Sequence, residues 1–122
     1  MKRPRIVLIE DDTWVQQQHA RVLGTEFEVH AAANALEGID AIDRIRPDAI
    51  VLDIFMPGPN GVVLLHEIRS HVDLAIIPII LATNNAAEIS LAQMKPYGVV
   101  EVLDKTTMHP EDLPAAIRKA LS

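Results

Sequence analysis

The chain has 122 residues, of which 49% are hydrophobic and 23% charged, a composition typical of one globular domain with a sizeable core. It contains no cysteine, which excludes disulfides, thiolate catalysis and cysteine-based zinc sites. The formal net charge of −6 disfavours a nucleic-acid-binding surface. No apolar run approaches the roughly 18–20 residues of a membrane-spanning helix. We therefore expect a cytoplasmic protein that binds neither nucleic acid nor membrane.

Short apolar runs recur along the chain, each bounded by polar or turn residues. Such runs are typical of buried strands in a parallel sheet. The third run, which ends at Asp53, is followed directly by the turn-forming residues 57–61. We expect five strands, at residues 5–9, 27–31, 49–53, 79–82 and 99–103.

A segment with helical spacing of apolar residues follows each strand. Asp12 or Thr13, Asn34 and Asn60 are suitable N-caps for the first three helices. The fourth helix is expected over residues 86–94, and the fifth has Pro110 in its first turn. The expected inward-facing residues are Val15, His19, Val22 and Leu23; Leu36, Ile39, Ile42 and Ile45; Leu64, Leu65 and Ile68; and Leu113, Ile117, Ala120 and Leu121.

Strict alternation of strands and helices predicts the fold class. Right-handed crossovers place helices on both faces of a parallel sheet. We therefore expect one α/β domain over residues 1–122, a doubly wound five-stranded parallel sheet in the flavodoxin-like order 2-1-3-4-5 with five helices. In that order the first and third strands flank the switch point where ligands bind.

Acidic residues follow those two strands. Glu10 and Asp11 end the first strand and Asp53 ends the third, so three carboxylates are expected to share one pocket. Like charges about 4 Å apart repel by about 4 kcal/mol at an effective dielectric constant near 20, so the cluster needs a shared proton or a cation. Oxygen ligands suit Mg²⁺ or Mn²⁺.

Two further strand ends bring polar groups to the same edge. Thr83 follows the fourth strand and Lys105 the fifth. A cation site, a carboxylate nucleophile, a hydroxyl and a lysine together fit phosphoryl transfer onto Asp53.

The whole chain resembles the receiver domain of two-component response regulators. The family's acidic pair is similar to Glu10 and Asp11, and its phosphoacceptor motif to Asp53-Ile54-Phe55-Met56-Pro57-Gly58 with Gly61. Its conserved hydroxyl residue matches Thr83 and its lysine matches Lys105. Four motifs match, each at an expected strand end.

The resemblance implies a role for each matched residue. Asp53 would accept phosphate from a histidine kinase or a phosphotransfer protein. Glu10, Asp11, Asp53 and the backbone carbonyl of Phe55 would hold Mg²⁺, and Thr83 and Lys105 would bind phosphoryl oxygens. The output partner would dock on the face formed by the fourth helix, fifth strand and fifth helix, and the chain would act as a signalling switch and not as an enzyme, beyond its own phosphorylation and slow dephosphorylation.

Three positions depart from the family pattern. Val102 stands where most receivers have Tyr or Phe, Thr106 follows the lysine where proline is usual, and Asn84 replaces a small residue. A cis bond before Thr106 would cost about 2.5–4 kcal/mol, so we expect it to be trans. Trp14, beside the acidic pair, either shields the pocket or is ordinarily half-buried.

Two alternatives to the switch remain open. A degenerate receiver would serve as a constitutive protein-interaction module, as Val102 and Thr106 suggest. A Mg²⁺-dependent phosphatase would use Asp53 as nucleophile, but Phe55 stands where its acid/base aspartate is needed.

Overall fold

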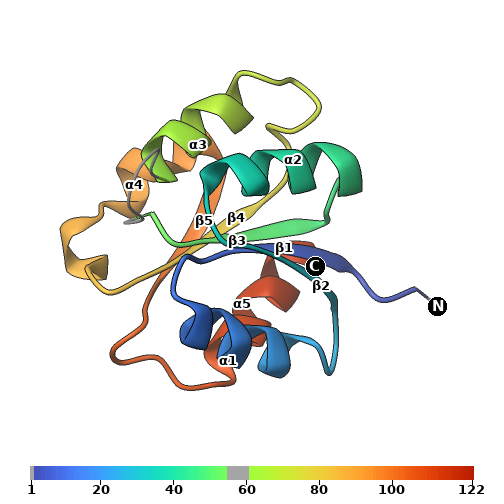
Figure 1. Ribbon diagram of the computed structural model, residues 1–122. Coiled ribbons are helices and arrows are strands. Elements are labelled where there is room, and N and C mark those ends of the chain that lie inside the picture. Colours follow the sequence, from blue (N-terminus) through green and yellow to red (C-terminus); the bar gives the residue numbers. More distant parts are fainter. Residues whose placement is uncertain (1, 55–60) are drawn as a thin grey trace.

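The structure is a computed structural model that describes residues 2–54 and 61–122. The expected caps, loop residues and motif positions between 55 and 60 lie outside the described residues. Figure 1 shows a central sheet with helices on both faces. The described elements are β1 (Arg5–Ile9), α1 (Thr13–Leu23), β2 (Glu28–Ala32), α2 (Ala35–Ile45), β3 (Ala49–Leu52), α3 (Gly61–Arg69), β4 (Ile79–Thr83), η1 (Ala86–Glu88), α4 (Leu91–Met94), η2 (Lys95–Tyr97), β5 (Val99–Asp104) and α5 (Asp112–Leu121).

The sheet has the predicted topology. Its five strands are all parallel and run in the order β2-β1-β3-β4-β5, which confirms the doubly wound fold. Side chains of successive strand residues point to opposite faces. In β1, Val7 and Ile9 accordingly pack into the core under α2 and α3, whereas Ile6 and Leu8 pack into the core under α1 and α5.

Polar caps fix the start of two helices as expected. The side chain of Asp12 accepts a hydrogen bond from the backbone nitrogen of Val15, and that of Asn34 accepts one from the backbone nitrogen of Glu37. Each cap satisfies an amide that has no partner inside its helix. The Asp12 cap places α1 directly after the end of β1, which carries Glu10 and Asp11.

Several expected inward positions are wrong. Leu36 is 72% exposed, because the buried stripe of α2 runs through Ala35, Gly38, Ala41, Ile42 and Ile45. Leu121 is 36% exposed because it is the last residue of α5. Pro110 precedes α5, which begins at Asp112, and Pro114 occupies its first turn instead, where a missing N–H costs no helical hydrogen bond.

The fourth helix is also different from the expectation. Residues 86–97 form two short 3-10 helices around the four-residue α4, instead of one helix over 86–94. Ser90 caps α4 by accepting a hydrogen bond from Gln93, and Gly98, at φ 89°, ends η2. No side chain of these three elements is buried, so packing does not hold them together as one helix.

No helix among the described residues is long and apolar enough to cross a membrane.

Candidate functional site

The register of β1 and β3 brings the acidic residues together. Ile9 pairs with Leu52, so Glu10 and Asp53 are the next residue on each strand. The backbone nitrogen of Asp53 donates to the carbonyl of Ile9 at 3.0 Å, and that of Glu10 donates to Ala32 at 3.0 Å. The sheet therefore extends its hydrogen bonding up to the two carboxylates and fixes where they point.

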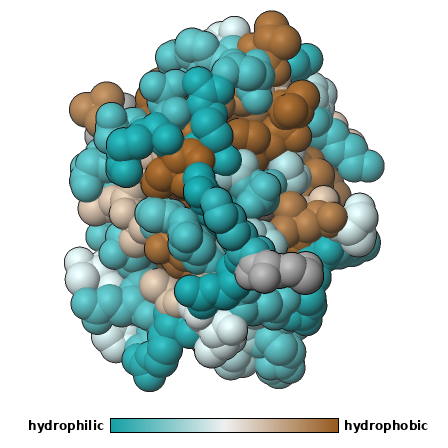
Figure 2. All heavy atoms as spheres, turned by 90° about the vertical axis from the view of Figure 1, so that its right-hand side faces the viewer, coloured by the Kyte–Doolittle hydropathy of each residue, from teal (hydrophilic) through white to brown (hydrophobic). Residues whose placement is uncertain are grey.

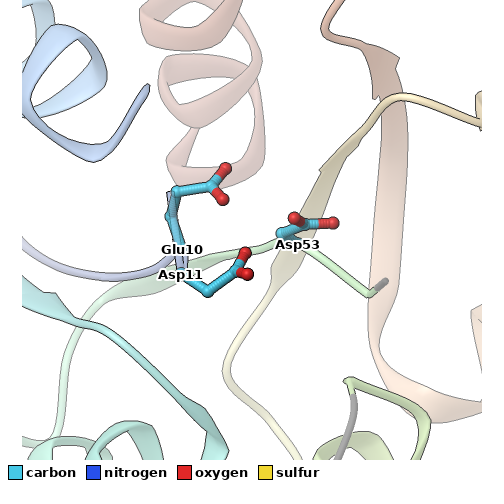
Figure 3. A group of neighbouring side chains, drawn as sticks. All are labelled: Glu10, Asp11 and Asp53. Carbon is cyan, nitrogen blue, oxygen red and sulfur yellow. The ribbon is translucent and has the colours of Figure 1, made fainter. Parts of the chain in front are cut away.

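Three carboxylates converge at this edge. Glu10, Asp11 and Asp53 each offer an oxygen within 4.8 Å of the others (Figure 3). Glu10 is 2% exposed and Asp53 7% exposed, whereas Asp11 is open to solvent. The pocket is therefore lined by the core on one side and is accessible from the side of Asp11.

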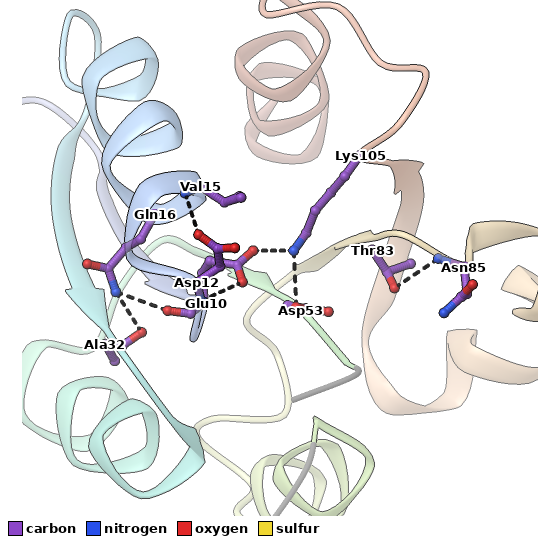
Figure 4. A network of polar contacts seen from close by, with 9 residues as sticks. All are labelled: Glu10, Asp12, Val15, Gln16, Ala32, Asp53, Thr83, Asn85 and Lys105. Atoms are coloured by element: carbon purple, nitrogen blue, oxygen red, sulfur yellow. Dashed lines mark hydrogen bonds and ion pairs between the residues drawn. The ribbon is translucent and has the colours of Figure 1, made fainter. Parts of the chain in front are cut away.

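Lys105 reaches the same pocket from the end of β5. Its Nζ lies 3.0 Å from Oδ2 of Asp53 and forms a second ion pair with Oε1 of Glu10 (Figure 4). The Lys105 side chain is only 8% exposed, and its backbone nitrogen donates to the carbonyl of Thr83. One buried ammonium thus partly neutralises two buried carboxylates.

Burial controls the ionisation of Glu10. The pKa of Glu10 is raised to about 7, chiefly by desolvation; hydrogen bonds from Lys105 and the amide of Asp12 and the charge of Lys105 act in the opposite direction, and the charge of Asp53 adds a smaller increase. Burial would lower the pKa of Lys105, but the hydrogen bonds to Glu10 and Asp53 outweigh it, so the pKa of Lys105 is raised. Lys105 stays charged, and Glu10 remains short of compensating positive charge near neutral pH.

The chemistry of this donor set fits a hard divalent cation. All three groups supply carboxylate oxygens, the ligands that Mg²⁺ and Mn²⁺ prefer. The exposed Asp11 leaves room for water ligands, which Mg²⁺ usually retains. Among the described residues no other group of three or more acidic or histidine side chains could hold a metal ion.

Gln16 supports the pocket in a way that the sequence did not reveal. Its Nε2 donates to the carbonyls of Glu10 and Ala32, at 3.1 and 3.2 Å, and so ties α1 to the ends of β1 and β2. The amide of Asp12 donates to Oε2 of Glu10 at 3.2 Å. A polar residue one turn after the cap, on the side of α1 that faces the sheet, was the only signal available.

Thr83 is the last residue of β4 and is completely buried. Its Oγ1 accepts a hydrogen bond from the backbone nitrogen of Asn85 at 3.4 Å (Figure 4). The hydroxyl thus lies at the predicted edge and contacts the connection that leads to α4. The predicted carbonyl ligand, Phe55, lies outside the described residues.

The positions that depart from the family pattern are also placed. Val102 is half-buried and packs against the core under α2 and α3, and Asn84 is exposed. No cis peptide bond occurs within residues 2–54 and 61–122, so the bond before Thr106 is trans, as expected. Trp14 is 68% exposed, so the expected half-burial is wrong.

Comparison with known proteins identifies the family. The sequence model of the Response regulator receiver domain matches residues 6–118. The chain therefore belongs to the receiver domains of response regulators, as its motifs predicted.

Relatives and solved structures agree with this assignment. Over 103 residues the chain is 31% identical to protein-glutamate methylesterase/protein-glutamine glutaminase 1 of Anaeromyxobacter dehalogenans, covering 84% of this chain and 29% of that protein. It is 30% identical to hybrid signal transduction histidine kinase D of Dictyostelium discoideum, covering 84% of this chain and 7% of the kinase. The chain thus spans less than a third of the length of these curated relatives.

Among solved structures, chemotaxis protein CheY4 of Vibrio cholerae superposes with a TM-score of 0.85 at 23% identity, covering 98% of this chain and 99% of that one. A sensor protein from Polaromonas sp. JS666 gives a TM-score of 0.90 at 24% identity, covering 98% and 96%. At these identities the likeness shows the shared fold.

Proposed function

We propose that residues 1–122 form a single receiver domain that is phosphorylated on Asp53 and acts as a cytoplasmic signalling switch. The observation that carries the proposal is the placement of Asp53, a buried carboxylate 3.0 Å from Lys105 and within 4.8 Å of two further acidic side chains. A histidine kinase or a phosphotransfer protein is the proposed donor, in keeping with the family.

In the proposed reaction a carboxylate oxygen of Asp53 attacks phosphorus in line. An O–P bond to Asp53 forms while the N–P bond of the donor phosphohistidine breaks, and the imidazole leaves with that electron pair. Lys105, already beside Asp53, neutralises charge on the phosphoryl oxygens, and the hydroxyl of Thr83 donates a hydrogen bond to one of them. Both groups stabilise charge that the transferred group brings into the pocket.

A divalent cation, Mg²⁺ or Mn²⁺, would be held by Glu10, Asp11, Asp53 and the carbonyl of Phe55. When bound, it supplies positive charge that stabilises the phosphoryl oxygens during transfer. The carboxylates would position it, with Asp11 on the side of the pocket that is open to solvent.

Phosphorylation provides the direct test. The protein is incubated with acetyl phosphate and MgCl₂, and its intact mass is measured. We expect one added phosphoryl group on the wild type and none on Asp53→Asn or in excess EDTA. An unmodified wild type, or a modified Asp53→Asn protein, would overturn the proposal. Turnover of a general phosphomonoester would instead support the phosphatase alternative, whereas we propose no catalysis beyond the chain's own dephosphorylation.

A constitutive binding module is the second candidate, because Val102 cannot report phosphorylation by a large aromatic rotation. Beryllofluoride, which mimics an acyl phosphate, separates the two readings in ¹⁵N NMR spectra. A switch predicts amide shifts that extend from the pocket through residues 84–105 to the face of α4, β5 and α5. A constitutive module predicts shifts confined to the neighbours of Asp53.

A further inference from the structure

A hollow of about 360 Å³ lies between α2 and α3, and none of the residues of the acidic pocket lines it. Its floor is apolar: Ile42, Ile68 and Leu74 are buried, and Ile39 is half-buried. Leu36 stands at its border and is 72% exposed. We call this hollow the α2–α3 groove. Leu36 and the exposed part of Ile39 are therefore the apolar surface that the groove offers to a ligand.

Further apolar side chains are exposed in the segment that follows α3. The segment that joins α3 to β4 carries Leu74 on the groove floor and also Val72 and Ile76, which are 88% and 82% exposed. Figure 2 shows brown apolar side chains among teal polar ones in the upper part of its face, the level at which α2, α3 and this segment lie in Figure 1. An apolar surface rimmed by polar groups, at a hollow, is typical of a protein-binding site.

The rim of the groove is acidic. Three carboxylates line it, and no lysine or arginine does so among the described residues: the acidic side chains are Asp40, Asp43 and Glu67. Asp73, the residue before Leu74, does not line the groove but adds a fourth carboxylate near it. The arrangement favours a ligand that carries positive charge beside apolar groups.

Arginine and histidine side chains of the same chain form only exposed ion pairs with these carboxylates. Arg44 lies 3.8 Å from Asp40, and Arg46 lies 3.2 Å from Asp43 and also pairs with Asp73. His71 lies 3.2 Å from Glu67. Every side chain in these pairs is half or more exposed, and such pairs contribute little to stability. Two guanidinium groups and one imidazole for four carboxylates leave negative charge for a partner to neutralise.

We propose that the α2–α3 groove docks a cationic amphipathic helix of a partner protein. Apolar residues on one face of that helix would cover Leu36 and Ile39, and lysines or arginines at its edges would pair with the acidic rim. A second copy of this chain is a poor occupant, because its formal net charge of −6 would bring like charges together. This surface is separate from the face of α4, β5 and α5 expected for output.

A synthetic peptide serves as the probe. It has about three helical turns, with leucines at positions i, i+3, i+4 and i+7, lysines flanking that face and alanines elsewhere. A second peptide has glutamate in place of each lysine. Both are titrated into the full ¹⁵N-labelled chain with Mg²⁺ present, so that the acidic pocket does not compete for the lysines.

We expect the lysine peptide to shift amides of α2, α3 and residues 71–77, and the glutamate peptide to leave them unchanged. Leu36→Glu should weaken binding about tenfold, because it removes an apolar contact and places a carboxylate that must lose water against the leucine face of the peptide. Val100→Glu, a matched change at a 46%-exposed valine of β5, should leave affinity unchanged. Glu67→Gln should weaken binding a few-fold and reduce its dependence on salt.

Four results would overturn the proposal. These are shifts centred outside the groove, equal binding of the two peptides, an equal effect of Leu36→Glu and Val100→Glu, and concentration-dependent dimerisation of the free chain that Leu36→Glu abolishes. The last result would assign the groove to a second copy. Leu36 and Val100 are both surface residues, and matched thermal unfolding of the two variants verifies that each retains the fold.

Discussion

The carboxylate pocket and the connection between β4 and β5 are packed in opposite ways. In the pocket, the side chains of Glu10, Asp53 and Lys105 are ionisable and yet almost completely buried. In the connection, residues 84–98 include not one buried side chain, although several of them are apolar. The chain thus fixes its reactive groups inside the core and leaves the segment next to Thr83 with little packing.

That difference has a physical cause. Glu10 and Asp53 extend β1 and β3, whose residues are shielded on both faces, and Lys105 at the end of β5 is held by its ion pairs with both carboxylates. The connection contains three helical pieces of three or four residues, too short to form a continuous apolar stripe. A segment with few buried contacts opens at low free-energy cost, which would allow the proposed response to phosphorylation.

Hydrogen exchange should show the largest contrast. Amides of β1, β3 and β4 should exchange only through global unfolding, whereas those of residues 86–97 should exchange through local opening that costs several kcal/mol less. Native-state exchange with NMR or mass-spectrometric detection measures both. Equal protection of the two regions would contradict the inference that residues 86–97 open more easily than the strands.

Removal of the Lys105 ammonium should have the next largest effect on the free energy of unfolding. Lys105→Met removes the ammonium from two buried carboxylates and should destabilise the metal-free protein by about 3 kcal/mol. Urea denaturation in EDTA measures the loss, and added Mg²⁺ should reduce it. The matched change in the connection, Lys95→Met at an exposed lysine of η2, should remain within about 0.5 kcal/mol of wild type.

The two regions also differ in how closely other atoms approach the backbone of a glycine. A Cβ at Gly61 would lie 2.4 Å from the Cα of Ile54, so Gly61→Ala forces α3 away from the residue after Asp53 and should cost about 2 kcal/mol. A Cβ at Gly98 would lie 3.5 Å from its nearest neighbour, the carbonyl oxygen of Ile77. Gly98→Ala should therefore cost only the strain of a φ of 89°, about 1 kcal/mol. Urea denaturation of both variants tests this order, which a larger loss for Gly98→Ala would contradict.

The smallest effect concerns His19, whose Nδ1 is buried and has no hydrogen-bond partner among the described residues. Burial, and then the charge of Lys105, lowers the pKa of His19 below its ordinary 6.5. The unfolded chain therefore binds this proton more readily, so the contribution of neutral His19 is complete above about pH 6.5 and is lost as the pH falls.

Replacement of His19 by leucine should reduce the loss of stability between about pH 7.5 and about pH 5.5. Glu10 titrates in the same range with the opposite sign, because its pKa is raised, so the informative quantity is the difference between His19→Leu and wild type in EDTA. A difference that does not change with pH would contradict the inference that burial lowers the pKa of His19.

The order of the strands, and the edge of the sheet at which the acidic residues meet, could be predicted from the sequence. Apolar runs such as Ile6–Ile9 and Ala49–Leu52 are buried on both faces, which only a covered parallel sheet provides. Because every such strand ends on the same edge, Glu10, Asp11 and Asp53 had to meet there. Local caps such as Asp12 and Asn34 were also predictable, since their hydrogen bonds reach only three residues along the chain.

The tertiary structure decided what depends on packing between distant segments. Spacing placed Leu36 and the end of α5 inward, but the faces of α2 and α5 that meet the sheet exclude Leu36 and Leu121. The broken α4 follows from the absence of a buried stripe, which no local pattern reports. Within the site, the sequence determined which charged groups share the edge. Only the folded sheet decided that Lys105 would contact both Glu10 and Asp53, because a contact between residues 95 and 52 positions apart depends on strand register and not on local preference.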